Sequence, residues 1–332
     1  MLYPLTFEPI FKERVWGGRR LAELYGKPLP SGKVVGESWE ITDRPEGVSV
    51  VSNGPLAGKD LRWLMTNHAA DLLGDLVAPG SRFPWLIKIL DCEDDLSLQV
   101  HPPAALAQRL GGEPKTEMWF VAEARPGSKL YVGLRRGTTR AGFEAALANG
   151  TVADCFHVVP VGSGDTMFVP SGRVHALGRG NVIFEIQQNS DTTYRVFDWN
   201  RLGLDGKPRE LHVEQSLASI DFTDFEPQLV DSGWQQTSTG PARSLVSDPL
   251  FNVSHHHLVE SDHFEVSFDQ GGPVVVGVHR GEIEVISNTG STRRRAGEFA
   301  LLPACLRHCE LRTADKADFL LVSAPTKHLR PT

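Results

Sequence analysis

A twelve-residue pattern occurs twice in this chain with identical spacing. In each copy, a glycine and an acidic residue precede an apolar run, a proline stands six residues after the glycine, and a histidine follows five residues later. A glycine-led turn followed by a short apolar run predicts a β-strand, so the repeat predicts one β unit built twice. The marker residues are Gly164, Pro170 and His175 in the first copy, and Gly297, Pro303 and His308 in the second.

Short apolar runs separated by turn-forming residues dominate the rest of the chain, which has 32 Gly and 22 Pro among 332 residues. Short apolar runs divided by frequent turns favour a mainly β fold of sandwich or barrel type over alternating βα units. Small and polar residues accumulate within 222–241, so we place a boundary near residue 230, between a domain of residues 1–230 and one of residues 231–332. Short helices are expected at residues 19–25, 58–76, 104–110 and 139–149.

Four side chains from three separate segments of the first domain offer metal ligands: Gln99, His101, Glu117 and His175. Two imidazoles, one carboxylate and one amide oxygen suit a divalent ion such as zinc that keeps a coordination position open for substrate. Residues 96–101 read as a strand, and its period-two alternation places Ser97, Gln99 and His101 on one face. The same alternation in the strand expected near Glu117 places Trp119 and Val121 on the face of Glu117, together with Lys115 two residues before it. Either histidine alone would more often be an ordinary core or turn residue, but the joint set favours a metal site.

Histidines of the second half are not expected to bind metal. The strands expected before the second repeat, at residues 273–278 and 281–286, contain no counterpart of Gln99 and His101. The second domain therefore reads as a degenerate copy of the first. The run His255-His256-His257 lies in an expected strand, 252–259, where neighbouring side chains alternate faces, and we interpret it as a chance run or an exposed edge.

The charge balance argues against some classes of partner. The chain has 34 Lys and Arg against 41 Asp and Glu, a formal net charge of −7, which gives no electrostatic reason to bind nucleic acid or an anionic membrane. No apolar run approaches the roughly 20 residues that span a bilayer, and the first residues lack the order of a secretory signal. We expect a cytoplasmic protein with its four cysteines reduced, whose state as monomer or homodimer the sequence leaves open.

The repeat and the ligand pattern resemble motifs of the cupin superfamily, whose members are small jelly-roll β-barrels. The glycine, proline and histidine of residues 164–175 resemble the second cupin motif, and Gln99-Val100-His101 with a downstream Glu resembles a variant of the first. More specifically, an ordered series of segments is similar to that of class I mannose-6-phosphate isomerases in a compact bacterial form. These segments are residues 11–18, 36–39, 97–102, 115–119, 170–176 and 191–195.

This resemblance implies two cupin-type barrels, of which the first binds one zinc ion through Gln99, His101, Glu117 and His175. It also implies a catalytic arginine at Arg195 and an active-site acid at Asp191. The implied reaction interconverts mannose 6-phosphate and fructose 6-phosphate through a cis-enediol, whose developing negative charge a zinc ion stabilises. The sugar phosphate is the implied small-molecule partner, and its candidate binding residues are Lys115, Lys88, Ser97, Glu37 and Trp16.

Two questions stay open at the level of the sequence. The base that moves the proton is Asp191, Glu37, Lys88 or a zinc-bound water, since each is able to act once the pocket shifts its pKa. The planar guanidinium of Arg195 could equally bind the phosphate group, although the resemblance favours its catalytic role, and the next candidate cations are Lys88 and Lys115. Alternative functions on the same scaffold are a metal-dependent oxygenase, a different sugar isomerase and a non-catalytic sugar-binding cupin.

Overall fold

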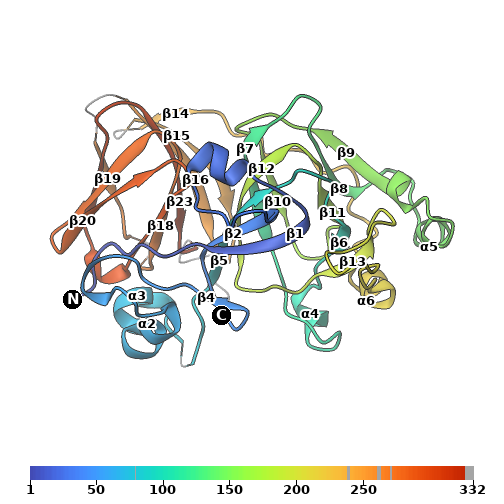
Figure 1. Cartoon of the computed structure of the whole chain (residues 1–332), viewed down its shortest axis with the longest axis horizontal. Helices are drawn as coiled ribbons and strands as arrows, with labels where there is room; N and C mark the ends of the chain where they lie inside the picture. The colour runs from blue at the N-terminus through green and yellow to red at the C-terminus, as the bar shows by residue number, and fades with distance from the viewer. Residues whose placement is uncertain (79, 238–239, 260–262, 270, 326–332) are drawn as a thin grey trace.

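The computed structural model describes residues 1–78, 80–237, 240–259, 263–269 and 271–325, and it consists of two pairs of antiparallel sheets that lie next to each other (Figure 1). The expected mainly β fold, with two cupin-type jelly rolls and a few short helices, is confirmed. In the described part of the chain no helix is long and apolar enough to cross a membrane.

The first pair of sheets carries the expected metal ligands. Apolar side chains from both sheets, including Trp119 and Val121 from one and Leu130 and Val132 from the other, form one buried cluster. The six-stranded sheet has the order β1 (Ile10–Gly18), β2 (Val35–Ile41), β5 (Trp85–Asp91), β12 (Asn181–Gln188), β7 (Glu117–Ala124), β10 (Thr166–Val169). The five-stranded sheet has the order β13 (Tyr194–Phe197), β6 (Leu98–Val100), β11 (His175–Leu177), β8 (Lys129–Leu134), β9 (Phe156–Pro160).

The second pair repeats this plan and has its own buried cluster. Its larger sheet has the order β14 (Gln235–Thr237), β15 (Gly240–Ser247), β16 (Asn252–Leu258), β23 (Ala317–Ser323), β18 (Val274–Arg280), β21 (Phe299–Leu302). Its smaller sheet has the order β17 (His263–Val266), β22 (Cys309–Arg312), β19 (Glu282–Ser287), β20 (Gly290–Arg295). A separate hairpin joins β3 (Asp43–Arg44) to β4 (Gly47–Val48).

The two copies of the repeat occupy equivalent places in these sheets. The apolar run of each copy forms the last strand of its six-stranded sheet, β10 in the first half and β21 in the second, and each strand ends immediately before the repeat's proline. Proline has no backbone N–H for the strand ladder, so it ends the pairing in both copies. The histidine of the first copy begins β11, whereas His308 immediately precedes β22.

Helices are short and lie outside the sheets. The stretch expected at residues 58–76 is broken near His68 into α2 (Leu61–Asn67), α3 (Ala69–Leu73) and the 3₁₀ turn η2 (Gly74–Leu76). The other expected helices form as α1 (Arg20–Tyr25), α4 (Ala104–Ala107) and α5 (Arg140–Ala148). The sequence did not predict α6 (Val213–Ser219), which has no side-chain N-cap. It also did not predict the 3₁₀ turns η1 (Gly54–Leu56), η3 (Val152–Cys155) and η4 (Ala304–Leu306).

Strand β7 joins the two halves because its side chains alternate. Glu117, Trp119 and Val121 point toward the space between the first two sheets, whereas Met118 and Phe120 belong to a cluster that includes residues of the second half. The N-terminal segment adds a second link, since Leu5 and Leu301 exchange two backbone hydrogen bonds of 2.8 Å. The second half therefore supports the strand that carries Glu117.

Two buried histidines of the second half lie against β7. The rings of His255 and His279 pack edge-on against Phe120, with centroids 5.0 and 4.9 Å away. His279 also places its Nε2 3.0 Å from the carbonyl oxygen of Ala122. The interpretation of the histidine run as an exposed edge is wrong, because β16 lies between β15 and β23 and His255 is buried.

We expect His255 to make folding stability depend on pH. Burial, followed by the positive charge of Arg243, lowers the pKa of His255 to about 2, whereas an unfolded histidine titrates near 6.5. Only the unfolded state binds the proton in that interval, so the free energy of unfolding falls as the pH drops below about 6.5.

Denaturant unfolding at about pH 7 and about pH 5 should show a loss of stability that is up to about 2 kcal/mol larger in the wild type than in His255→Gln. His308→Gln, a change at an exposed ring, is the control and should keep the wild-type difference. An unchanged pH dependence in His255→Gln would contradict the prediction.

Candidate metal centre and substrate pocket

Three of the four expected ligands form one compact buried group. The ligand atoms of His101, Glu117 and His175 all lie within 4.8 Å of one another, and each side chain is at most 1% exposed. His101 directly follows β6, Glu117 begins β7 and His175 begins β11. The fourth residue, Gln99, pairs with His175 in the strand ladder and places its side-chain amide 3.2 Å from the Nε2 of His175.

The polar atoms of this group fit a bound cation. Glu117 has one carboxylate oxygen 3.5 Å from the Nε2 of His101 and the other 3.4 Å from the Nε2 of His175. The Oε1 of Glu117 and both ring nitrogens of His101 are buried without a hydrogen-bond partner, and the Oε2 of Glu117 has the Lys115 ammonium as its ion-pair partner at 3.0 Å. Buried polar atoms without partners are costly, and a divalent ion among them would satisfy several at once. A half-turn of the Gln99 amide would present its oxygen to the same space.

The two histidines are held in the neutral state that metal binding needs. Burial, and after it the neighbouring Lys115 cation, lowers the pKa of His101 to about 3. Burial also lowers the pKa of His175. The Nδ1 of His175 lies 2.8 Å from the carbonyl oxygen of Arg173, which fixes the proton on Nδ1 and leaves the lone pair of Nε2 directed into the site.

Lys115 and Glu117 share one face, as expected from their spacing, and form a buried ion pair of 3.0 Å. Burial alone would raise the pKa of Glu117, but the neighbouring Lys115 cation holds it well below its usual range. The Glu117 carboxylate is therefore charged at neutral pH, which suits a ligand for a divalent cation.

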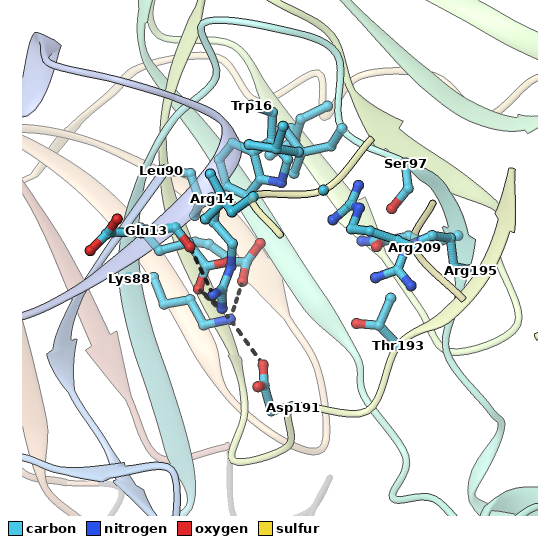
Figure 2. A pocket seen from close by; sticks show the side chains of 18 of the residues that line it. Glu13, Arg14, Trp16, Lys88, Leu90, Ser97, Asp191, Thr193, Arg195 and Arg209 are labelled. Carbon is cyan, nitrogen blue, oxygen red and sulfur yellow. Dashed lines mark hydrogen bonds and ion pairs between the residues drawn. The ribbon is translucent and has the colours of Figure 1, made fainter. Parts of the chain in front are cut away.

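A pocket of about 590 Å³ adjoins this group, and eight of the eleven predicted site residues line it (Figure 2). The other three, His101, Glu117 and His175, form the buried group that could hold a metal ion, and Gln99 lines the pocket beside them. The pocket collects residues from segments that are far apart in the sequence. The predicted residues that line it are Trp16, Glu37, Lys88, Ser97, Gln99, Lys115, Asp191 and Arg195.

One wall of the pocket holds Lys88 among three carboxylates. Its Nζ lies 3.9 Å from Glu37, 3.4 Å from Glu185 and 3.7 Å from Asp191. Burial opposes ionisation of Glu37, but Lys88 and Arg14 lower its pKa to about 2. Burial, and then the charge of Glu117, raises the pKa of Glu185. The Asp191 side chain is 32% exposed, so it is the carboxylate of the three that reaches solvent most.

Comparison with known proteins identifies this combination of site and fold. A family model, described as the catalytic domain of type I phosphomannose isomerase, matches residues 5–118. The mannose-6-phosphate isomerase of Streptococcus mutans is 36% identical over 309 residues, which cover 92% of this chain and 94% of that protein. The chain belongs to the mannose-6-phosphate isomerase family.

Solved structures of mannose-6-phosphate isomerases have the same fold. The crystal structure of the enzyme from Bacillus subtilis superposes with a TM-score of 0.87 at 28% identity, covering 97% of this chain and all of that one. A mannose 6-phosphate isomerase bound with zinc and yttrium has a TM-score of 0.74 at 17% identity and covers 98% of this chain, a likeness of fold alone. The resemblance inferred from the short motifs is thus confirmed over nearly the whole chain.

Five charged residues that line this isomerase pocket were not among the sequence candidates: Glu13, Arg14, Glu185, Asp205 and Arg209. Glu185 could have been recognised from the sequence, because it is the one acidic residue within the apolar strand β12. A buried carboxylate needs a charged or hydrogen-bonding partner, so an acid in such a strand indicates a polar site. It accepts a hydrogen bond of 3.2 Å from the indole of Trp119. Arg209 lies in the polar segment between β13 and α6, where no periodic pattern indicates which side chain turns inward.

Proposed function

We propose that this chain is a zinc-dependent isomerase that interconverts mannose 6-phosphate and fructose 6-phosphate. The observation that carries the proposal is the buried group of His101, Glu117 and His175 beside a pocket lined by Gln99. Two neutral imidazoles, one carboxylate and one amide oxygen are a donor set typical of zinc with an open position. Membership of the isomerase family supports the same substrate pair.

The reaction moves a proton from C2 to C1 of the open-chain sugar through a cis-enediol. When bound by Gln99, His101, Glu117 and His175, zinc supplies a Lewis acid that stabilises negative charge on the substrate oxygens. Arg195 lines the pocket and, in our proposal, binds the same oxygens through its permanently charged guanidinium. Ser97, Lys115 and Trp16 line the pocket as further substrate contacts.

Asp191 is our proposed base, which accepts the proton at C2 and returns it at C1. Glu37 suits this role poorly because its carboxylate accepts hydrogen bonds of 2.7 and 3.3 Å from Arg14 and one of 2.6 Å from Trp39. A carboxylate with a pKa of about 2 is also a weak proton acceptor. Glu37 instead orients Lys88, which in turn lies 3.7 Å from Asp191. Lys88 thereby orients the base and the substrate hydroxyls beside it.

The division of the chain into two domains is also a proposal. The strands of the first pair of sheets end with β13 at Phe197, and those of the second begin with β14 at Gln235. We propose residues 1–230 as the catalytic unit and residues 231–332 as its degenerate copy. The isolated first unit should not be stable, because Phe120 packs against His255 and His279 and would face water without them.

Removal of the metal tests the proposed function. Protein stripped with a chelator should convert mannose 6-phosphate to fructose 6-phosphate at less than about 1% of the rate of protein reloaded with one equivalent of zinc, since the Lewis acid contributes several kcal/mol. The assay is run in air and under anaerobic conditions. Equal rates in both support an isomerase, a need for oxygen and iron would support an oxygenase, and zinc binding without turnover would support a sugar-binding protein.

A further inference from the structure

The end of strand β12 carries two consecutive glutamines, Gln187 and Gln188, which the proposed mechanism does not use. In the strand ladder, Gln187 stands opposite Glu117 of β7. Opposite residues of an antiparallel pair lie on the same face, so the side chain of Gln187 is a direct neighbour of the Glu117 side chain. Gln187 is fully buried and lies outside the pocket lining that the structure describes, so any effect it has on the reaction passes through other residues.

The amide of Gln187 holds the turn that leads to Asp191. Its Nε2 donates to the carbonyl oxygen of Gln188 at 2.9 Å and to that of Ser190 at 2.5 Å. Two carbonyl oxygens accept hydrogen bonds only from the amide nitrogen, which fixes the orientation of the amide group. The carbonyl of Ser190 belongs to the planar peptide group that joins Ser190 to Asp191. Gln187 thereby fixes the backbone immediately before the proposed base.

The position of Asp191 depends on its backbone more than on its side-chain contact with Lys88. The Asp191 carboxylate lies 3.7 Å from the Nζ of Lys88, a separation longer than a hydrogen bond (Figure 2). The Asp191 side chain is 32% exposed, so water competes for this contact. A base must come within hydrogen-bond distance of the proton that it accepts, and a displacement of about 1 Å can cost roughly 100-fold in rate. The proposed proton transfer therefore requires a firmly held turn before Asp191.

Gln188 fastens the same turn to the segment that carries Glu117. Adjacent side chains of a strand point to opposite faces, so the two glutamines contact different segments. The Oε1 of Gln188 accepts the backbone N–H of Thr116 at 2.8 Å, and the backbone N–H of Gln188 donates to the carbonyl oxygen of Thr116 at 3.0 Å. Thr116 lies between Lys115 and Glu117. The glutamine pair thus connects the segment of a proposed metal ligand to the turn before the proposed base.

Stability alone does not explain the amide of Gln187. Its Oε1 is buried without a hydrogen-bond partner, a cost that an apolar side chain of the same length would not have. We propose that Gln187 is a positioning residue, which holds Asp191 at the distance where its carboxylate exchanges a proton with the substrate. The inference rests on the proposed function, since it takes Asp191 as the base of the isomerisation.

The test compares Gln187→Met with Asn181→Leu in the zinc-loaded protein. Asn181, at the other end of β12, is a matched control because it is also fully buried, donates to two carbonyl oxygens, at 2.8 and 3.1 Å, and leaves its Oδ1 without a partner. Gln187→Met should lower kcat for mannose 6-phosphate by about 10- to 100-fold, with KM within about threefold of the wild type and one metal ion retained. Asn181→Leu should keep kcat within about threefold. Amide hydrogen exchange of residues 188–194 should be at least about fivefold faster in Gln187→Met and unchanged in Asn181→Leu.

A double-mutant cycle separates positioning from a general structural effect. In the Asp191→Asn background, Gln187→Met should change kcat by less than about threefold, because no base is left to position. An equal loss in both backgrounds, or a loss in Asn181→Leu as large as that in Gln187→Met, would overturn the inference. If Gln187→Met does not fold, Gln187→Asn, whose amide reaches less far, replaces it and should show the same pattern with a smaller loss.

The outcomes also separate this inference from the proposed function. Wild-type protein that isomerises mannose 6-phosphate, with an unchanged kcat in Gln187→Met, would overturn the positioning role and leave the isomerase intact. Loss of the metal in Gln187→Met would overturn it as well, since the effect would then pass through Glu117. Faster exchange of residues 188–194 in Gln187→Met, when the wild type has no isomerase activity, would support the hold of Gln187 on the turn and contradict the proposed function.

Discussion

His175→Ala is expected to lose the bound metal and to lower kcat/KM for mannose 6-phosphate by at least about a hundredfold. The Nε2 of His175 lies 3.4 Å from Glu117 in the group proposed to hold zinc, and its Nδ1 is already fixed by Arg173. Removing a partner of a ligand commonly costs 10- to 100-fold in metal affinity or activity, so removing a ligand itself should cost about 100-fold or more. Metal content by elemental analysis and steady-state kinetics measure the two effects.

The repeat provides an internal control for this experiment. His308 occupies the position of His175 in the second copy, but its side chain is 63% exposed and its neighbour is Glu265, at 3.5 Å. His308→Ala should keep one metal ion per chain and wild-type kcat/KM. A large loss of activity in His308→Ala, or full metal content in His175→Ala, would contradict the assignment of the chemistry to the first half.

Asp191→Asn is expected to lower kcat by about 10²- to 10⁴-fold while the protein keeps its metal, because the amide no longer accepts the proton from C2. Asp191 lines the pocket, contacts Lys88 and is not one of the three residues that form the buried ligand group. The measurements are kcat, exchange of the C2 proton with solvent, and metal content. Loss of metal in Asp191→Asn would show that the substitution acts through the metal site instead.

Asp205→Asn is the matched control for the base. Asp205 also lines the pocket and loses one charge in the same way. Its kcat should stay within about threefold of the wild type, since it faces no proposed proton-transfer path. Near-normal kcat in Asp191→Asn would exclude Asp191 as the base and direct attention to Glu185, whose pKa is raised by burial and by Glu117.

The alternation of side chains along a strand predicted a large part of this site. Strand alternation placed Glu117, Trp119 and Val121 on one face of β7, and the structure has them there. The same rule paired Lys115 with Glu117, which lie 3.0 Å apart. The helix at 58–76 was less accurate, because a hydrophobic pattern does not reveal where a single residue such as His68 leaves the helical conformation.

Other features depended on contacts that no local pattern records. The burial of His255 follows from the position of β16 between two strands and from its packing against Phe120 of the other half. The surroundings of Lys88 combine side chains from β2, β5 and β12 with Asp191 from the segment before β13. Such groupings arise when sheets pair and pack over long sequence separations.

The sequence by itself determined the repeat, the mainly β fold, the candidate metal ligands and the family, because strand faces and motif spacings are properties of neighbouring residues. Only the tertiary structure decided which charges share a wall of the pocket. The carboxylates around Lys88 come from distant segments. Their grouping depends on distances that only the packed chain defines, since electrostatic interactions fall with separation and with exposure to water.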